Sequence, residues 1–179
     1  MGGALLLSNI YSQTKSRALF IDEAMPDVSF GKLIYYKDST ATRLDFPKKL
    51  IILDFWFPNC SACIEMFPIM DSLQQQFNKH LQVIMVTRHS KDEVLPVIHK
   101  WEQQYHRKWV LPIVINDTIL HKLFKHRAEP NYVWIAPENR FVAQTASFFI
   151  TKEILASYID NIPNEIIKSG YPLDSLYIK

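Results

Sequence analysis

The chain has 179 residues, a hydrophobic fraction of 48% and a formal net charge of +2, which fits one globular domain with a substantial core. Acidic and basic residues are interspersed, so the charge pattern argues against a nucleic-acid-binding surface, and no apolar run is long enough to span a bilayer. The two cysteines are too few for a disulfide-rich scaffold.

Residues 1–16 contain a short apolar patch, Ala4 to Leu7, followed by small and polar residues. This arrangement is similar to the end of a secretory signal peptide that lacks its basic start. A disordered N-terminus is the alternative interpretation. We expect the folded domain to begin near residue 17 in either case.

The first half of the chain contains two strand signals and one helix signal. Alternating apolar and polar residues around "KDST" predict a β-hairpin over residues 28–46. The continuous β-prone run at 48–57 predicts a strand buried on both faces, as central parallel strands are. From Cys60 to Phe77 apolar residues recur every three to four positions, which predicts an amphipathic helix kinked at Pro68.

The second half continues the alternation of strands and helices. Asp117 and Thr151 are expected to cap two of the helices, and residues 163–179 have weak periodicity and are expected to form a tail. Such alternation predicts a mixed sheet with helices on both faces. The expected elements are a strand at 81–87, a helix at 92–106, a short strand at 109–115, a short helix at 117–126, strands at 131–136 and 140–146, and a helix at 151–162.

Cys60 and Cys63 lie where the predicted central strand gives way to a helix. The partial positive charge of a helix N-terminus favours a thiolate, which is the nucleophile in disulfide exchange. The spacing places the second sulfur one helical turn away, where it can resolve a mixed disulfide. A structural bridge is less favoured, because so short a loop restricts the unfolded chain little. We therefore predict a redox pair in which Cys60 attacks and Cys63 resolves.

The segment DFWFPNCSACIEMFP, residues 54–68, resembles the active-site segment of thioredoxin-fold proteins, whose usual form is close to D-F-W-x-x-W-C-G-P-C-x-x-x-x-P. Over about residues 25–162 the order of elements resembles the extracytoplasmic reductases of the TlpA/ResA type. The resemblance implies an α/β, thioredoxin-like three-layer sandwich over residues 17–162, with a mixed central sheet flanked by helices and an N-terminal β-hairpin extension. The matching residues are Asp54, Phe55, Trp56, Cys60, Cys63 and Pro68.

The resemblance also implies roles for three further residues. Pro130 matches the cis-proline that begins the strand opposite the cysteines. Glu129, the residue before it, would offer backbone groups to an extended substrate. Asp54 matches the buried carboxylate that helps to deprotonate the second cysteine, and burial is expected to raise its pKa.

The departures from the family pattern mark where this chain is expected to differ in potential and partners. Asn59 replaces the usual aromatic residue before the first cysteine, "SA" replaces "GP" between the cysteines, and Glu129 replaces a small or β-branched residue. A Glu129 carboxylate close to the sulfur would disfavour the thiolate and make the pair more reducing. Glu129, Asn59 and Trp56 are the candidate substrate contacts, although Trp56 is expected mainly to pack beneath the cysteines.

Metal binding by the cysteines is the main chemical alternative. A zinc site would need two more ligands, and His121 and His126 come much later, at a spacing that fits one helical face poorly. All six histidines are expected on the surface. A Cu(I) carrier that uses the same cysteines stays open, as does a thioredoxin-like binding module without redox turnover. No metal ion or organic cofactor is expected.

These inferences predict a thiol-disulfide oxidoreductase that acts as a reductase on protein disulfides and dithiols. Its oxidised form would be recharged by an upstream thiol donor, which would be a membrane reductant if the chain is exported. A monomer without a nucleic-acid partner is expected. The periplasm or cell envelope is the expected location, with the cytoplasm as the alternative.

Overall fold

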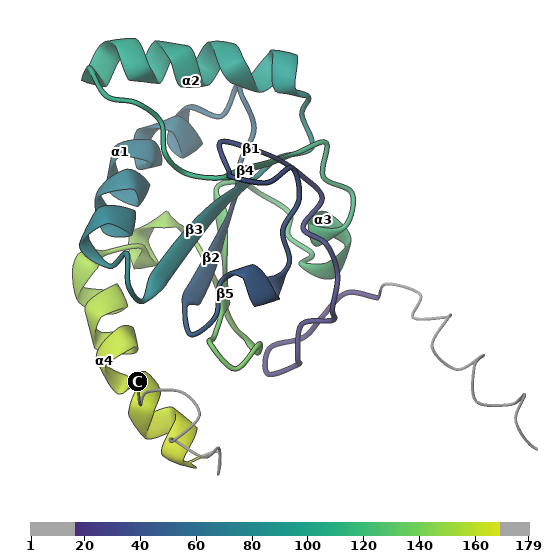
Figure 1. The fold of residues 1–179 in the computed structure, drawn as a ribbon, viewed down its shortest axis with the longest axis vertical. Coiled ribbons are helices and arrows are strands. Elements are labelled where there is room, and N and C mark those ends of the chain that lie inside the picture. Colours follow the sequence, from purple (N-terminus) through teal and green to yellow (C-terminus); the bar gives the residue numbers. More distant parts are fainter. Residues whose placement is uncertain (1–16, 169–179) are drawn as a thin grey trace, which may run out of the picture.

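The computed structural model describes residues 17–168, with side chains described through residue 161. Its centre is a six-stranded mixed sheet in the order β1-β4-β3-β2-β5-β6 (Figure 1). The strands are β1 (Lys32–Ile34), β2 (Leu50–Phe55), β3 (Leu81–Val86), β4 (Ile113–Ile115), β5 (Asn131–Ile135) and β6 (Phe141–Thr145). The helices are α1 (Ser61–Gln76), α2 (Lys91–Tyr105), α3 (Leu120–Leu123) and α4 (Lys152–Lys168), with 3-10 turns at Arg43–Asp45 and Ser147–Phe149.

Strand β2 occupies the middle of the sheet, as its continuous apolar run predicted. All six of its residues are buried. It pairs in parallel with β3 and antiparallel with β5, so the predicted mixed sheet is confirmed. A central position leaves no face of β2 in water, which explains why its sequence is apolar without alternation.

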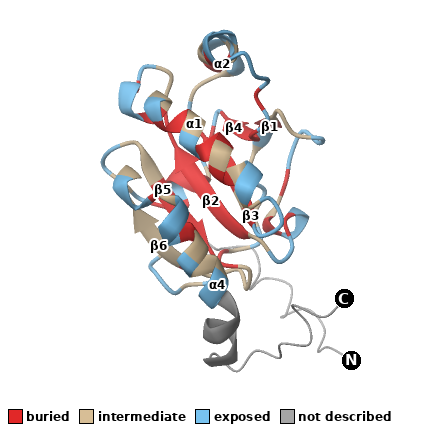
Figure 2. Cartoon of the chain, turned by 90° about the vertical axis from the view of Figure 1, so that its left-hand side faces the viewer, coloured by how far each residue is buried: buried red, intermediate tan, exposed pale blue. Residues whose placement is uncertain are grey.

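The two faces of β2 contribute to two different cores. Ile52 and Trp56 pack on one face with buried residues of α1, α2 and α4. Leu53 and Phe55 pack on the other face with α3 and with the segment that precedes β1. Successive strand residues point to opposite faces, so consecutive residues of β2 serve two layers. Burial is most complete in the inner strands β2, β3, β4 and β5, whereas β6 at the edge is mostly intermediate (Figure 2).

The expected N-terminal hairpin at 28–46 forms only in part. Two backbone hydrogen bonds of 2.8 Å join its arms, from Phe30 N–H to the Ala41 carbonyl and from Leu33 N–H to the Ser39 carbonyl. Only β1 is a strand, and its sheet partner is β4 rather than a second hairpin arm. The return arm instead enters the Arg43–Asp45 turn, because a capping box between Thr42 and Asp45 stabilises helical geometry there.

Three other elements differ in length from the expectation. Strand β4 covers only the end of 109–115, because Pro112 has no N–H and the Trp109 N–H donates to a Glu102 carboxylate oxygen at 2.9 Å. Helix α3 is a single turn within 117–126. Helix α4 continues to Lys168, past the expected start of the tail at 163, so the proline at 163 does not end it.

Two further observations concern the rest of the chain. The apolar patch at residues 4–7, and with it the predicted signal-peptide remnant, lies outside the described residues. Among the helices of residues 17–168, none combines the length and the apolar character that a membrane crossing requires.

Candidate active site

Cys60 and Cys63 form a disulfide at the N-terminus of α1. Cys60 is the N-cap residue of this helix, and its Sγ accepts a hydrogen bond from the Cys63 backbone N–H at 3.1 Å. The unpaired N–H groups and partial positive charge of a helix start would stabilise negative charge on the Cys60 sulfur after reduction. The predicted placement of the pair at a strand-to-helix junction is therefore confirmed.

A short turn connects the end of β2 to Cys60. The Trp56 N–H still donates to the Val86 carbonyl at 3.0 Å, and the Cys60 N–H donates back to the Phe57 carbonyl at 3.0 Å. Cys60 is 6% exposed and Cys63 only 1% exposed. Cys60 is thus the less buried residue of the pair, which agrees with its expected role as the attacking residue.

The backbone before β5 lies against this sulfur. The Glu129–Pro130 peptide bond is cis, the form expected from the sequence. The Glu129 carbonyl oxygen lies 3.8 Å from Cys60 Sγ. The two segments meet because β2 and β5 are neighbours, with Phe55 opposite Asn131 in the register.

Asp54 is buried on the face of β2 that carries Trp56 and packs against α1. Neither of its carboxylate oxygens has a hydrogen-bond partner within residues 17–161, and the hydroxyl of Tyr132, directly opposite on β5, has none there either. Burial, and then the charge of Glu129, raise the pKa of Asp54 well above its ordinary value of 3.8. Burial and the Asp54 charge also raise the pKa of Tyr132. A raised pKa brings the carboxyl closer to a thiol in proton affinity.

The other two candidate contacts occupy different environments. The Trp56 side chain is fully buried, and its ring packs edge-on against Phe67 with centroids 5.0 Å apart. It belongs to the same buried cluster as Cys60 and Cys63, as the packing role requires. Asn59 is exposed directly before Cys60.

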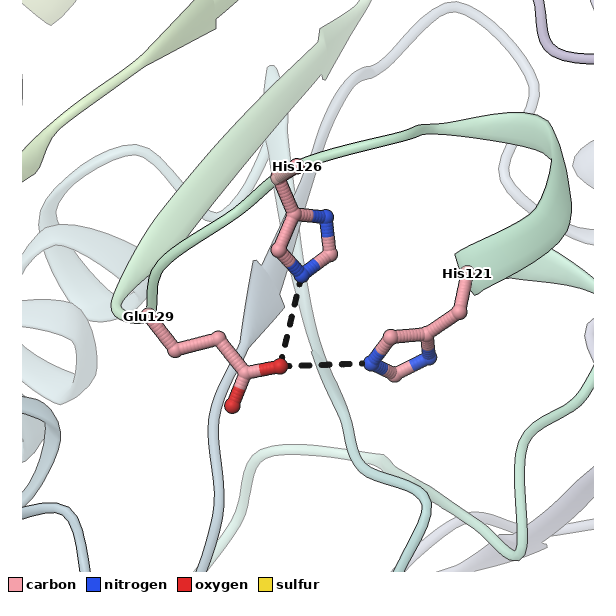
Figure 3. A group of neighbouring side chains, drawn as sticks. All are labelled: His121, His126 and Glu129. Atoms are coloured by element: carbon pink, nitrogen blue, oxygen red, sulfur yellow. Dashed lines mark hydrogen bonds and ion pairs between the residues drawn. The ribbon is translucent and has the colours of Figure 1, made fainter.

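A histidine–glutamate cluster, formed by His121, His126 and Glu129, lies beside the cis-proline (Figure 3). The Glu129 Oε1 atom is 3.4 Å from His121 Nε2 and 3.3 Å from His126 Nε2. Partial burial raises the pKa of Glu129, but the hydrogen bonds to the two histidines outweigh it and lower the pKa to about 2. The carboxylate is directed to the histidines, while the carbonyl of the same residue faces Cys60.

The prediction that all six histidines are on the surface was wrong. His121 is only 4% exposed, and the side chain of His126 is 7% exposed. The sequence argument that His121 and His126 fit one helical face poorly also failed, because it assumed one continuous helix over both residues. Helix α3 ends at Leu123, where Phe124 leaves helical geometry, and the following loop brings His126 back toward His121.

Asp117 holds the His121 ring from the side opposite Glu129. Its Oδ2 atom lies 2.6 Å from His121 Nδ1, and the carboxylate also accepts the backbone N–H groups of Leu120 and His121 at 3.0 and 2.9 Å. Burial lowers the pKa of His121, but its hydrogen bonds to Asp117 and Glu129 have the larger combined effect and raise it. The N-cap residue of α3 is Ile119 and not Asp117 as expected, but the Asp117 carboxylate still accepts N–H groups at the helix start and fixes the orientation of the histidine.

Phe55 and a cavity complete the surroundings of the histidine–glutamate cluster. The Phe55 ring centroid lies 4.8 Å from that of His121 and 4.7 Å from that of His126. A cavity of about 310 Å³ opens beside the three residues. Its other lining residues are Trp56, Phe57, Arg88, His89, Arg127 and Ala128.

No protein-family model and no curated protein sequence matches the chain. Solved structures do resemble it. The thioredoxin domain of a thiol-disulfide oxidoreductase from Bacteroides vulgatus is 19% identical, with a TM-score of 0.60 over 79% of this chain and 99% of that one. The exposed lipoprotein thioredoxin of Streptococcus pneumoniae is 18% identical, with a TM-score of 0.58 over 76% and 99%. A thioredoxin-like protein solved in its oxidised form is 19% identical, with a TM-score of 0.60 over 80% and 97%. The fold is therefore thioredoxin-like, as predicted.

Proposed function

We propose that this chain is a thiol-disulfide oxidoreductase that reduces disulfides of protein substrates through Cys60 and Cys63. The observation that carries the proposal is the position of the pair. The less buried cysteine of the pair caps a helix N-terminus, and the backbone carbonyl before Pro130 lies 3.8 Å from its sulfur. A nucleophile and an adjacent extended backbone are the two parts that exchange with a polypeptide needs.

In the first step the reduced Cys60 thiolate attacks a sulfur of the substrate disulfide. A mixed disulfide forms between Cys60 and the substrate, and the second substrate sulfur leaves as a thiolate. The Glu129 carbonyl and the N-terminal end of β5 lie where an extended substrate segment would add beside the sheet. Exposed Asn59 flanks the same position.

In the second step the Cys63 thiolate attacks Cys60 and releases the remaining substrate thiolate. The product is the Cys60–Cys63 disulfide that the structure contains. Asp54 accepts the Cys63 proton in this step, because its raised pKa makes the transfer less uphill than it would be to an ordinary carboxylate. An upstream dithiol donor then reduces the disulfide and completes the cycle.

Two structural neighbours support this assignment. One is described as a thiol-disulfide oxidoreductase and another as an exposed lipoprotein thioredoxin. The second supports a location in the cell envelope. The proposal includes the periplasm as such a location and a membrane reductant as the upstream donor there. The chain acts as a monomer in this proposal.

Reduction of insulin disulfides with dithiothreitol as donor tests the activity. The native chain should accelerate insulin precipitation well above dithiothreitol alone, and Cys60→Ser should remove the acceleration. A native rate equal to that of dithiothreitol alone would contradict the proposal and leave the binding-module interpretation. Tight one-to-one binding of Cu(I) by the reduced chain, without insulin turnover, would instead favour a copper carrier.

A further inference from the structure

The histidine–glutamate cluster brings three potential metal ligands to one point on the face of the sheet opposite Asp54. His121 lies on α3, His126 on the following loop, and Glu129 directly before β5. One ligating atom from each lies within 4.8 Å of the other two. Their side chains are 3%, 7% and 13% exposed, so the three groups are largely removed from water.

The hydrogen bonds of the two rings decide which nitrogens face Glu129. His126 Nδ1 lies 2.9 Å from the Phe124 carbonyl oxygen, which can only accept, so Nδ1 carries the proton. His121 Nδ1 donates in the same way to the Asp117 carboxylate. In the neutral rings both Nε2 lone pairs therefore point at an ionised carboxylate oxygen, which is also an acceptor. Three acceptors that converge on one point need either a proton on a ring Nε2 atom or a metal cation between them.

The separations fit a metal ion better than protons. Charge-assisted N–H···O bonds are about 2.7–2.9 Å long, whereas Glu129 Oε1 lies 3.4 and 3.3 Å from the two Nε2 atoms. Bonds of about 2.0–2.1 Å to a tetrahedral zinc ion put neighbouring ligand atoms about 3.3–3.4 Å apart. The two observed distances thus match two of the three edges that such a site would have among these ligands, and the two Nε2 atoms lie within 4.8 Å of each other.

The surroundings of the ligands are those of a metal site as well. Metal-bound histidines generally donate their second ring N–H to a carboxylate or a backbone carbonyl, which fixes the ring and increases its basicity. Here the Asp117 carboxylate and the Phe124 carbonyl provide one acceptor to each ring. We propose that His121 Nε2, His126 Nε2 and the Glu129 carboxylate bind a divalent first-row metal ion of the zinc type.

The three side chains leave at least one coordination position open toward the adjoining cavity. Imidazole and carboxylate ligands together suit Zn²⁺ and other divalent first-row metal ions. They do not suit Cu(I), which prefers thiolates. Arg88 and Arg127 line the same cavity. Their charges oppose a bare cation but favour an anionic fourth ligand, such as hydroxide or a carboxylate. The cysteines are not ligands in this site, which separates it from the Cu(I) carrier and from the redox function.

Titration of the oxidised, chelator-treated chain with Zn²⁺ near neutral pH, followed by calorimetry, tests the proposal. The disulfide cannot supply a thiolate, so binding must come from other groups. One zinc ion should bind per chain. His126→Asn should weaken binding by more than about 100-fold, since loss of even an outer partner of a ligand costs about 10- to 100-fold. His99→Asn, at an exposed position on α2, is the matched control and should leave the affinity unchanged.

Absence of zinc binding, or binding that His126→Asn and Glu129→Gln leave unaltered, would overturn the proposal. Binding that disappears in the Cys60→Ser, Cys63→Ser double variant would overturn it too, because the ion would then belong to the cysteines. The Co²⁺-loaded chain provides a second measurement. Its visible absorption should show a low-symmetry nitrogen and oxygen site without sulfur-to-cobalt charge transfer, and the bands should be absent in folded His126→Asn.

Discussion

The two faces of β2 near its C-terminal end carry two different groups of reactive side chains. On one face the chemistry comes from a single stretch of sequence, in which Asp54, Cys60 and Cys63 follow one another through a strand, a turn and a helix start. On the other face His121 and Glu129 meet only because a one-turn helix and a loop return the chain to the sheet. Local spacing therefore predicts the cysteine pair, and the family resemblance adds Asp54, whereas the second group depends on the tertiary path.

The largest expected effect concerns the asymmetry of the two cysteines. Cys60→Ser should abolish insulin turnover, because no accessible nucleophile remains. Cys63→Ser should still attack the substrate but fail to resolve, so a mixed disulfide should accumulate and be visible on non-reducing gels. Trapping by Cys60→Ser instead of Cys63→Ser would reverse the assigned roles.

Asp54→Asn tests the proton acceptor on the cysteine face. Without this base the resolution of the mixed disulfide should slow by roughly 100-fold, whereas attack by Cys60 should change little. Stopped-flow measurement of the two phases with a peptide disulfide separates them. Equal slowing of the attack and resolution phases would indicate that Asp54 has a structural effect only, and would contradict its role as the proton acceptor.

The same variant should alter stability in a pH-dependent way. The pKa of Asp54 in the folded chain lies above its ordinary value of 3.8, so ionisation of this group destabilises the folded state. Below pH 3.8 the Asp54 carboxyl is protonated in both the folded and the unfolded chain, so its ionisation should cause no difference in unfolding free energy between the native chain and Asp54→Asn. As the pH rises toward the raised pKa, the native chain should lose up to about 1.4 kcal/mol of unfolding free energy per pH unit relative to Asp54→Asn. Urea unfolding of both proteins across this range measures the difference, and parallel pH profiles would contradict it.

On the histidine face, Asp117→Asn should weaken zinc binding by about 10- to 100-fold without abolishing it, because it removes the partner that orients His121. Competition with a chromophoric chelator measures the change. His89→Asn is a suitable control, since His89 lines the same cavity but lies outside the histidine–glutamate cluster. An equal loss in both variants would show that the cavity, and not the cluster, governs affinity.

The smallest expected effect links the two faces. Glu129→Gln removes a negative charge near the cysteines, which should favour the Cys60 thiolate and make the pair less reducing. The carboxylate is already paired with two histidines, so the potential should rise by no more than about 30 mV, a tenfold change in equilibrium. The reduction potentials of Glu129→Gln and the native chain should be compared with a chelator present. A rise of more than about 60 mV in the variant would contradict the pairing of the Glu129 carboxylate with the two histidines.

These two regions also mark how far sequence reasoning reached. The central strand, the helix start and the order of Cys60 before Cys63 follow from local patterns, because each depends on residues within a few positions of one another. The cis bond at Pro130 was expected from the family resemblance. The length of α3 was overestimated. The apolar periodicity of "DTILHKLFKH" continues past Leu123, but the helical backbone geometry ends there.

The environment of Glu129 could not be predicted for a related reason. Whether its carboxylate points to the sulfur or away depends on where His121 and His126 lie, and that is set by the loop between α3 and β5. The available signal was that His121, His126 and Glu129 all fall within residues 121–129, the segment that precedes Pro130. Once that proline is placed beside β2, the short connection from α3 confines all three side chains to one end of the sheet.

The most direct test of the central claim is a redox titration of the Cys60–Cys63 pair in glutathione or dithiothreitol buffers, followed by tryptophan fluorescence, since Trp56 packs in the same cluster as both sulfurs. A protein reductase should show one reversible two-electron transition near about −270 mV. A transition near about −120 mV would contradict the reductase direction, and the absence of any reversible transition would contradict thiol-disulfide exchange itself.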